Sequence, residues 1–490
     1  MKIMLSVLSL FLVSFGYSEI NFDGNSKLNI KESLAQIEVP SVSADKKHSV
    51  NSKELKEWTI MVFVNAKNNL ESYGLSDVNE MEMVGSTDKI NIVAELGRIS
   101  GYSNADGDWK GCKRYYVTKD SDKTKITSPV LADNPKCDMG SWEYMVDFVN
   151  WAKANYPAKK YVLVVWNHGS GWDKGGNISE IMDKGISYDD ETRNHITTQQ
   201  LRMALEKIGG VNILAMDACL MQMIEVAYEI KDYAEYVVAS EETEPADGYT
   251  YNTWLEPLAA KPVMDSKELS VAMVNSYTDH YQSISQGATQ SSVNAKALSK
   301  LAAMSDEFIT AVMEANDITN AKNARTNAQK FYYSTNKDFY HFVKLITDAT
   351  QIPEVKSKGQ ALLDYLKNNA ITYNRAYGSK YSNAYGLAVY VPTYYTTSYD
   401  ELMWAKESKW DDFIKWMSMK DKFIGSICKF IGQAILGGYI YDCYKCVVDG
   451  SENCWCKKVS TTHIPPGGCD PILGCLPPVR NLKFGGCSYE

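Results

Sequence analysis

Two apolar segments of the chain each end at a residue that can take part in nucleophilic chemistry. Residues 211–216 lead to Cys219, and residues 161–166 lead to His168. A cysteine attacks a carbonyl carbon as the thiolate, and a nearby imidazole can take its proton. If the two segments are neighbouring parallel strands, His168 and Cys219 meet at the carboxyl edge of the sheet. The pattern therefore predicts a cysteine nucleophile with a histidine base.

The residues around this pair add to the prediction. Apolar residues at helical spacing follow Cys219, which predicts a thiol at a helix N-terminus, where its pKa is lowered. Gly169 lets the backbone approach closely, and its N–H together with that of Cys219 is the predicted oxyanion hole. A free cysteine is also commonly a small buried apolar residue, and a lone histidine is often structural. The residues alone leave that alternative open.

The cysteine count singles out one thiol. The chain has 11 cysteines, of which eight lie between residues 428 and 487 and two lie at positions 112 and 137. These ten can pair among themselves. An odd cysteine in an exported chain is a candidate reactive thiol, and here it is Cys219.

The N-terminus predicts export. Residues 1–18 have a lysine, an apolar stretch and small residues, which is typical of a cleaved signal peptide, although a retained anchor is the alternative. No later apolar run is long enough to cross a membrane, because Lys429 and several glycines interrupt residues 423–440. The expected location is secreted, periplasmic or at the cell surface.

Composition excludes some partners. A net charge of −9, without a basic block, argues against a nucleic-acid partner. Hydrophobic residues make up 45% of the 490 residues, which is ordinary for a globular protein of more than one domain.

Strand-like and helical patterns alternate between residues 58 and 240. The strand-like runs are continuous, which is typical of parallel strands buried on both faces; they lie at 58–64, 90–96, 161–166, 211–216 and 236–239. The predicted fold class is α/β, with a mainly parallel sheet flanked by helices. Thr197 and Gln200 fit a capping box that begins a helix.

Changes in pattern divide the chain into five segments. Residues 19–57 are polar and are predicted to be a pro-segment or linker, and residues 58–265 form the α/β core. Residues 266–422 are a mostly helical continuation, with one more strand at 386–391. Residues 423–490 are a cysteine-rich C-terminal module. Its cysteines and His463 could bind zinc, but disulfides are favoured in an exported protein.

Several blocks resemble one known family. Residues 166–172 and 216–221 are similar to the two catalytic blocks of the clostripain family of cysteine peptidases, which shares its fold group with caspases, legumains and gingipains. Further similar blocks lie at 58–71, 187–190 and 239–249, so the resemblance covers residues 58–260, with weaker similarity to about 420. It implies a caspase-like sandwich with His168 as proton shuttle and Cys219 as nucleophile.

The resemblance also implies a substrate class. The family prefers Arg or Lys before the scissile bond, and the acidic pocket maps onto Asp217 and Asp247. A partly desolvated carboxylate is a suitable partner for a guanidinium. Asp217 could instead cap a helix, and Asp247 with Gly248 could be only a turn.

Two regulatory properties are expected from the family. Self-cleavage in the loop after His168 is predicted to follow Lys174 or Lys184. The chemistry requires no cofactor, but calcium is possible by family resemblance. The acidic loop at residues 104–108 is not an EF-hand because Gly107 is misplaced, and Asn68 stands where many relatives have aspartate. No metal ligands can be assigned.

The leading hypothesis is a secreted cysteine endopeptidase, expected to be a monomer, which cleaves peptides and proteins after Arg or Lys through an acyl-enzyme. The alternative is an inactive, peptidase-like secreted protein that binds or adheres through its cysteine-rich tail.

Overall fold

The computed structural model describes residues 55–172 and 185–418, and beyond these only the backbone of the end of one helix and of four strands between residues 423 and 489. The predictions for the signal peptide, for Lys174 and Lys184, and for the pairing of the tail cysteines lie outside the described residues. Among the helices described, none is both long and apolar enough to cross a membrane.

A nine-stranded sheet forms the centre of the fold, in the order β12-β10-β9-β8-β5-β1-β2-β3-β4. The five strands from β9 to β2 are parallel, and two antiparallel strands extend the sheet on each side. The strands are β1 (Lys56–Ala66), β2 (Ile90–Arg98), β3 (Gly111–Tyr116), β4 (Val130–Asn134), β5 (Ala158–Trp166), β8 (Val211–Asp217), β9 (Ala234–Ala239), β10 (Ala288–Asn294) and β12 (Ile371–Tyr377). The predicted α/β fold with a mainly parallel sheet is confirmed.

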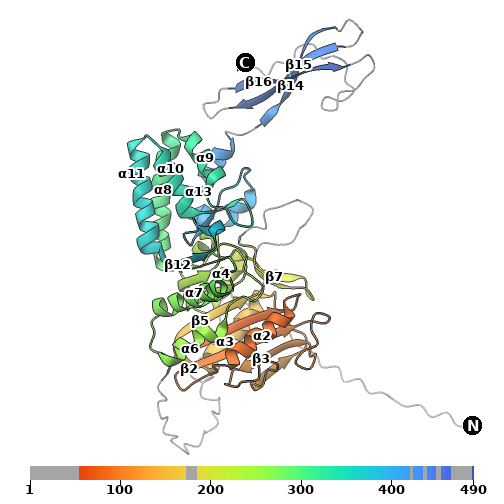
Figure 1. The fold of residues 1–490 in the computed structure, drawn as a ribbon, viewed down its shortest axis with the longest axis vertical. Coiled ribbons are helices and arrows are strands. Elements are labelled where there is room, and N and C mark those ends of the chain that lie inside the picture. Colours follow the sequence, from red (N-terminus) through yellow and green to blue (C-terminus); the bar gives the residue numbers. More distant parts are fainter. Residues whose placement is uncertain are drawn as a thin grey trace, which may run out of the picture. The chain divides into compact units, whose positions relative to one another are not determined.

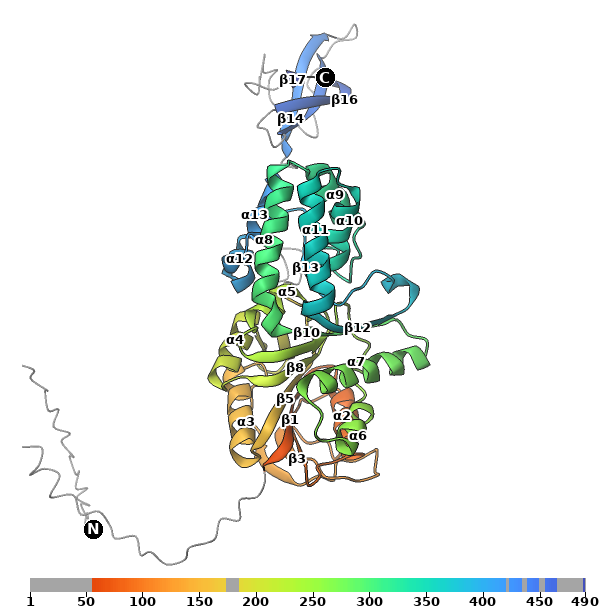
Figure 2. The ribbon, with the colours of Figure 1, turned by 90° about the vertical axis from the view of Figure 1, so that its left-hand side faces the viewer.

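Helices cover both faces of the sheet, so the continuous apolar strands are buried on both sides. Alternate residues of β1 enter two different cores: Met61 and Phe63 pack on one face, and Ile60 and Val62 pack on the other. Figure 2 shows the helices of the second face to the right of the sheet and α3 to its left. The second face carries α2 (Glu71–Glu82), α6 (Tyr251–Ala260) and α7 (Ser266–Ser283), and the first carries α3 (Trp142–Asn155), α4 (Thr198–Lys207) and α5 (Ile224–Glu229).

Local sequence fixes the ends of several helices. The capping box predicted for Thr197 and Gln200 is present at the start of α4, and Asp265 with Glu268 forms a second one at the start of α7. Pro353 occupies the first turn of α11, where its missing N–H costs nothing.

Helices of the C-terminal half gather in one group (Figure 1), whose apolar side chains join the core of the first face. They are α8 (Leu298–Glu314), α9 (Ile318–Asn327), α10 (Phe339–Ala349), α11 (Pro353–Tyr365), α12 (Met403–Glu407) and α13 (Trp410–Met419). Short strands β11 (Asn336–Asp338) and β13 (Ala388–Tyr390) pair with each other. The helical continuation predicted for residues 266–422 therefore also contains α10, two sheet strands and this small ribbon.

Strands β10 and β12 were not predicted, and the reason is their composition. β10 has the sequence ATQSSVN, yet all but its last residue are buried. Its polar side chains find partners inside the protein, as Ser291 does with the backbone oxygen of Gly386 and with the side chain of Gln222. β12 is half-exposed along its length. Neither strand shows the apolar run that identifies buried strands in a sequence.

The cysteine-rich region contains an antiparallel ribbon, β14 (Phe423–Gln433), β15 (Tyr439–Val448) and β16 (Cys454–Ile464), with β17 (Ser488–Tyr489) parallel to β16. The division of the chain into five segments stays a prediction.

Candidate active site

The carboxyl ends of two adjacent parallel strands bring His168 and Cys219 together. β5 pairs with β8 so that Trp166 lies opposite Asp217, and both residues of the predicted dyad follow within two positions. They line one pocket of about 170 Å³. The lining residues are Leu70, Trp166, Asn167, His168, Asp217, Ala218, Cys219, Glu244, Pro245, Ala246 and Gly248. The predicted neighbourhood of the two strands is thus confirmed.

The imidazole of His168 is oriented by a side chain from the loop after β1. Its Nε2 lies 2.7 Å from Oδ1 of Asn69. Because an amide oxygen only accepts, this hydrogen bond forms when Nε2 carries the proton, which makes Nδ1 the basic nitrogen. The backbone of His168 is fixed as well, since its carbonyl accepts from the N–H of Ser187 at 3.3 Å.

The hairpin that holds His168 consists of β6 (Ile186–Asp189) and β7 (Asn194–Ile196), which the sequence did not predict. Tyr188 donates its N–H to Asn167, the residue before the histidine, at 2.7 Å. Asp189 forms a buried ion pair with Lys67, and Lys67 also donates to the carbonyl of Cys137.

Cys137 is tied to β3 by a disulfide with Cys112. The carbonyl of Cys137 accepts from the buried Lys67, so the disulfide, the ion pair and the hairpin form one continuous support behind the histidine.

Cys219 is the free thiol that the cysteine count singled out, and it is half-buried. Its Sγ accepts the N–H of Glu244 at 3.4 Å. The prediction that it lies at a helix start is wrong: α5 begins at Ile224 after Met223, and it has only six residues. Burial raises the pKa of the Cys219 thiol instead of a helix lowering it. This shift favours the neutral thiol, from which a base must remove the proton before the sulfur can act as a nucleophile.

Gly169 contacts the cysteine loop directly. A Cβ at this position would lie 2.6 Å from the carbonyl oxygen of Cys219, so only glycine fits. In the part of the chain that the structure describes, neither the N–H of Gly169 nor that of Cys219 donates to a backbone carbonyl. The N–H of Cys219 does act on its own thiol, and the role of the two N–H groups as an oxyanion hole stays a prediction.

Asp217 lies in the wall of the pocket and is only 4% exposed. It accepts the N–H of Tyr249 at 3.2 Å and the hydroxyl of Tyr251 at 3.0 Å. No helix starts at Asp217, so the alternative reading as a helix cap is wrong. Burial raises its pKa to about 6. Gly248 is required here, because a Cβ would lie 2.7 Å from Oδ1 of Asp217.

Asp247, the other predicted pocket acid, is exposed and is absent from the pocket lining, so its contact with substrate stays a prediction. The loop that carries it places Glu244 in the pocket instead. The sequence block at 239–249 contains four acidic residues, and nothing in their spacing shows which one lies beside the thiol.

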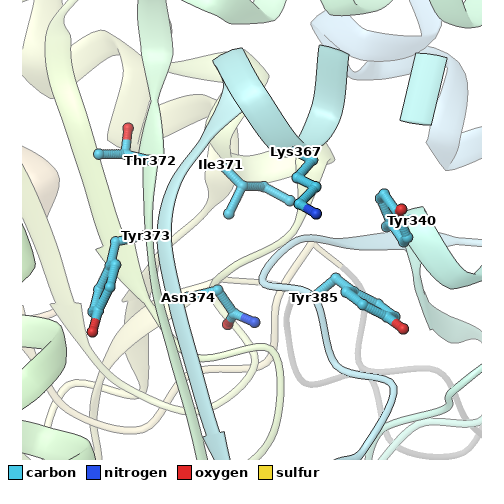
Figure 3. A pocket seen from close by; sticks show the side chains of 7 residues that line it. All are labelled: Tyr340, Lys367, Ile371, Thr372, Tyr373, Asn374 and Tyr385. Carbon is cyan, nitrogen blue, oxygen red and sulfur yellow. The ribbon is translucent and has the colours of Figure 1, made fainter. Parts of the chain in front are cut away.

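A second pocket, of about 270 Å³, lies beside β12 and is shown in Figure 3. Tyr340 and Tyr385 lie on one side of it and β12 on the other, with Lys367 above. Its lining has no cysteine, histidine or carboxylate, so it contains neither residue of the predicted dyad.

Calcium was possible only by resemblance. Within residues 55–172 and 185–418 no three His, Cys, Asp or Glu side chains are arranged to hold a metal ion. The described residues thus provide no ready ligand set, and calcium dependence stays a prediction.

Comparisons with known proteins identify the family of the chain. The model of the Clostripain family matches residues 62–416, more than half of the chain, so the protein belongs to the clostripain family. Clostripain of Hathewaya histolytica is 28% identical over 240 residues, which are 43% of this chain and 44% of that protein. The match thus spans less than half the length of this curated relative.

Solved structures share the fold. A secreted C11 cysteine protease from Bacteroides thetaiotaomicron, in complex with an irreversible peptide inhibitor, gives a TM-score of 0.54 at 19% identity, over 72% of this chain and 99% of that one. An inactive zymogen C11 protease from Parabacteroides distasonis gives 0.52 at 20% identity, over 72% and 98%.

Proposed function

We propose that the protein is a secreted cysteine endopeptidase that cleaves after Arg or Lys by way of an acyl-enzyme. The observation that carries the proposal is the shared pocket of His168, Cys219 and Asp217, which combines a base, a free thiol and a buried carboxyl. Membership of the clostripain family supports the same activity.

The geometry supports a two-step reaction. Nδ1 of His168 takes the thiol proton while Sγ of Cys219 forms a bond to the scissile carbonyl carbon, and the carbonyl electrons move to oxygen. The N–H groups of Gly169 and Cys219 then hold that oxygen. When the C–N bond breaks, the imidazolium gives its proton to the leaving amine. Water attacks the thioester with His168 as base, and the C–S bond breaks.

The pocket wall gives a reason for basic selectivity. A guanidinium or ammonium bound against Asp217 forms a charge-assisted hydrogen bond in a partly desolvated site. With the cation present, the carboxyl gives up its proton more easily, because an opposite charge lowers a carboxyl pKa.

Export and self-processing belong to the same proposal. The signal-like N-terminus and the secreted relative from Bacteroides thetaiotaomicron support secretion. The zymogen form of the Parabacteroides distasonis protein supports activation by cleavage, for which Lys174 and Lys184 are the predicted sites.

Hydrolysis of peptide reporters with Arg, Lys or Asn before the scissile amide tests the function. The wild-type protein is expected to hydrolyse the Arg and Lys reporters. Cys219→Ala, or alkylation of the thiol, is expected to lower the rate by at least about 1,000-fold, because the nucleophile is lost. Activity that survives Cys219→Ala, or no turnover of any basic reporter by the processed wild type, would contradict the proposal.

A further inference from the structure

Glu244 is an acidic residue whose backbone lies directly beside the proposed nucleophile. It lines the same pocket as Cys219 and Asp217, and its own N–H donates to the thiol. Both of its carboxyl oxygens are shielded from solvent, and neither accepts a hydrogen bond of normal geometry. Their polar neighbours are the carboxyl of Asp217 and the amide of Gln290. Such a group is costly to bury unless it gains a partner at some stage.

Among the described residues, the acidic residues around this wall form no ion pair, and the cation that acts electrostatically on Glu80 is the exposed Lys123. Asp77, Glu80, Asp217, Glu244 and Asp247 act on one another electrostatically. Within residues 55–172 and 185–418, none of the ion pairs formed by lysine or arginine includes any of the five. Without a cation nearby, buried carboxyls remain partly protonated. A cationic group of a ligand that enters such a site is stabilised by the carboxyls.

The other side chains around the carboxyls of the pocket wall are aromatic and uncharged. Four buried tyrosines pack around the carboxyls: Tyr249, Tyr251, Tyr277 and Tyr281. Burial raises the pKa of each of them, so none carries a charge at neutral pH. The rings keep water out, and the low polarity strengthens the attraction between a carboxylate and a bound cation.

We propose that Glu244 is a specificity-determining residue, which together with Asp217 binds the positively charged side chain before the scissile bond. This inference rests on the proposed function, because the pocket receives that side chain only if Cys219 is the nucleophile. On binding, the carboxyl exchanges its contact with Asp217 for a contact with the substrate cation. A carboxyl that carries a proton before binding releases it to solvent.

Glu244 suits this role better than Asp247 does. Asp247 is exposed to water and is not in the pocket lining, whereas Glu244 lines the pocket and touches the thiol. A cation held by an exposed carboxylate gains little, because water and salt screen the interaction. The same cation gains more between two shielded carboxylates.

Two reporters that differ only in charge provide the test. One has Arg before the scissile amide, and the other has citrulline, whose urea group has nearly the same shape as guanidinium but no charge. The quantity measured is the ratio of kcat/KM for Arg to that for citrulline. Glu244→Gln is expected to lower this ratio by about tenfold, a typical loss for one charge contact in a shielded site. Glu244→Asp is expected to give an intermediate ratio, and Asp247→Asn a smaller decrease than Glu244→Gln.

The results distinguish a failure of the proposed function from a failure of the role assigned to Glu244. If the wild type turns over neither Arg nor Lys reporters, the proposed function itself fails. If the wild type prefers Arg to citrulline but both Glu244 variants keep its ratio, the function stands and the role of Glu244 is overturned. A larger loss in Asp247→Asn than in Glu244→Gln also overturns it. Should Glu244→Gln not fold, Glu244→Asp alone decides between these results.

Discussion

Two pairs of buried carboxyl groups in this protein involve the same short loop after β9, yet they have different surroundings. Glu241 lies against Asp338, and Glu244 lies against Asp217. In each pair, burial raises the pKa of both carboxyls, to about 7 for Asp338 and about 6 for Asp217. The resemblance ends there, because the first pair is enclosed by backbone and the second faces a pocket.

The backbone satisfies the first pair. Asp338 accepts the N–H groups of His341 and Tyr385, and Glu241 accepts the N–H of Gly386 at 3.0 Å. These bonds join the start of α10 and the 384–386 segment to the loop after β9. Glu244, in contrast, has no such donors and lies in the pocket wall. The carboxyl pair whose oxygens accept backbone N–H groups therefore stabilises the fold. The pair in the pocket wall, which lacks such donors at Glu244, is the one we expect to bind a ligand.

The largest effect is expected for a change in the pocket pair, and it concerns the preference for the Arg reporter over the citrulline reporter. Asp217→Asn is expected to lower kcat/KM for the Arg reporter by about 100-fold, because one partner of a shielded charge pair is lost. The amide oxygen of asparagine can still accept from Tyr249 and Tyr251, so the fold is retained. The citrulline reporter measured with the same variant is the control. An equal loss on both reporters would show damage to the site instead of lost selectivity.

The next effect is a loss of unfolding free energy when the enclosed pair, Glu241 and Asp338, is disrupted. Asp338→Ala removes a helix cap and leaves two backbone N–H groups without an acceptor, so it is expected to cost on the order of 2–4 kcal/mol of unfolding free energy. Chemical denaturation followed by fluorescence measures this. The ratio of Arg to citrulline turnover in the folded variant serves as the internal comparison. If that ratio falls while stability is unchanged, the division between structural and binding pairs is wrong.

The smallest effect is a pH dependence of cation binding. The pKa of Asp217 is about 6, raised by burial, so the carboxyl takes up a proton as the pH falls below that value. A cation binds the deprotonated form, and its inhibition constant is expected to rise about tenfold between pH 7 and pH 5. Inhibition of the Arg reporter by agmatine measures this independently of the chemical step. The same inhibitor against Asp217→Asn should show a flatter profile, and an identical profile would count against Asp217 as the titrating group.

Sequence patterns were sufficient for the parts of the site that lie on buried strands. His168 and Cys219 follow continuous apolar runs, and such runs predict parallel strands whose carboxyl ends meet. The free state of Cys219 followed from cysteine counting. Such runs can be recognised in the sequence because a strand whose two faces are both covered by helices must be apolar throughout.

The parts that could not be predicted depend on contacts between distant segments. Cys219 does not begin a helix, because residues 220–223 form a loop that bonds to the segment after β9: the N–H of Leu220 donates to Glu242 and that of Gln222 to Ser240. In the same loop, Glu244 donates its N–H to the thiol and Asp247 is exposed. No periodicity in the sequence encodes which face of an irregular acidic loop is buried.

The residues on both sides of the 173–184 segment are held in place by contacts within the fold. The N–H of Ser170 donates to the carbonyl of Gly185 at 3.0 Å, and the N–H of Gly185 donates back to the hydroxyl of Ser170 at 3.2 Å. Trp172 is packed edge-on against Tyr390 and Tyr399. Both ends of the 173–184 segment are thus anchored independently of the peptide bonds between them. A single cut there would change covalent connectivity without releasing a fragment, and the product would be a two-chain protein held together by these contacts.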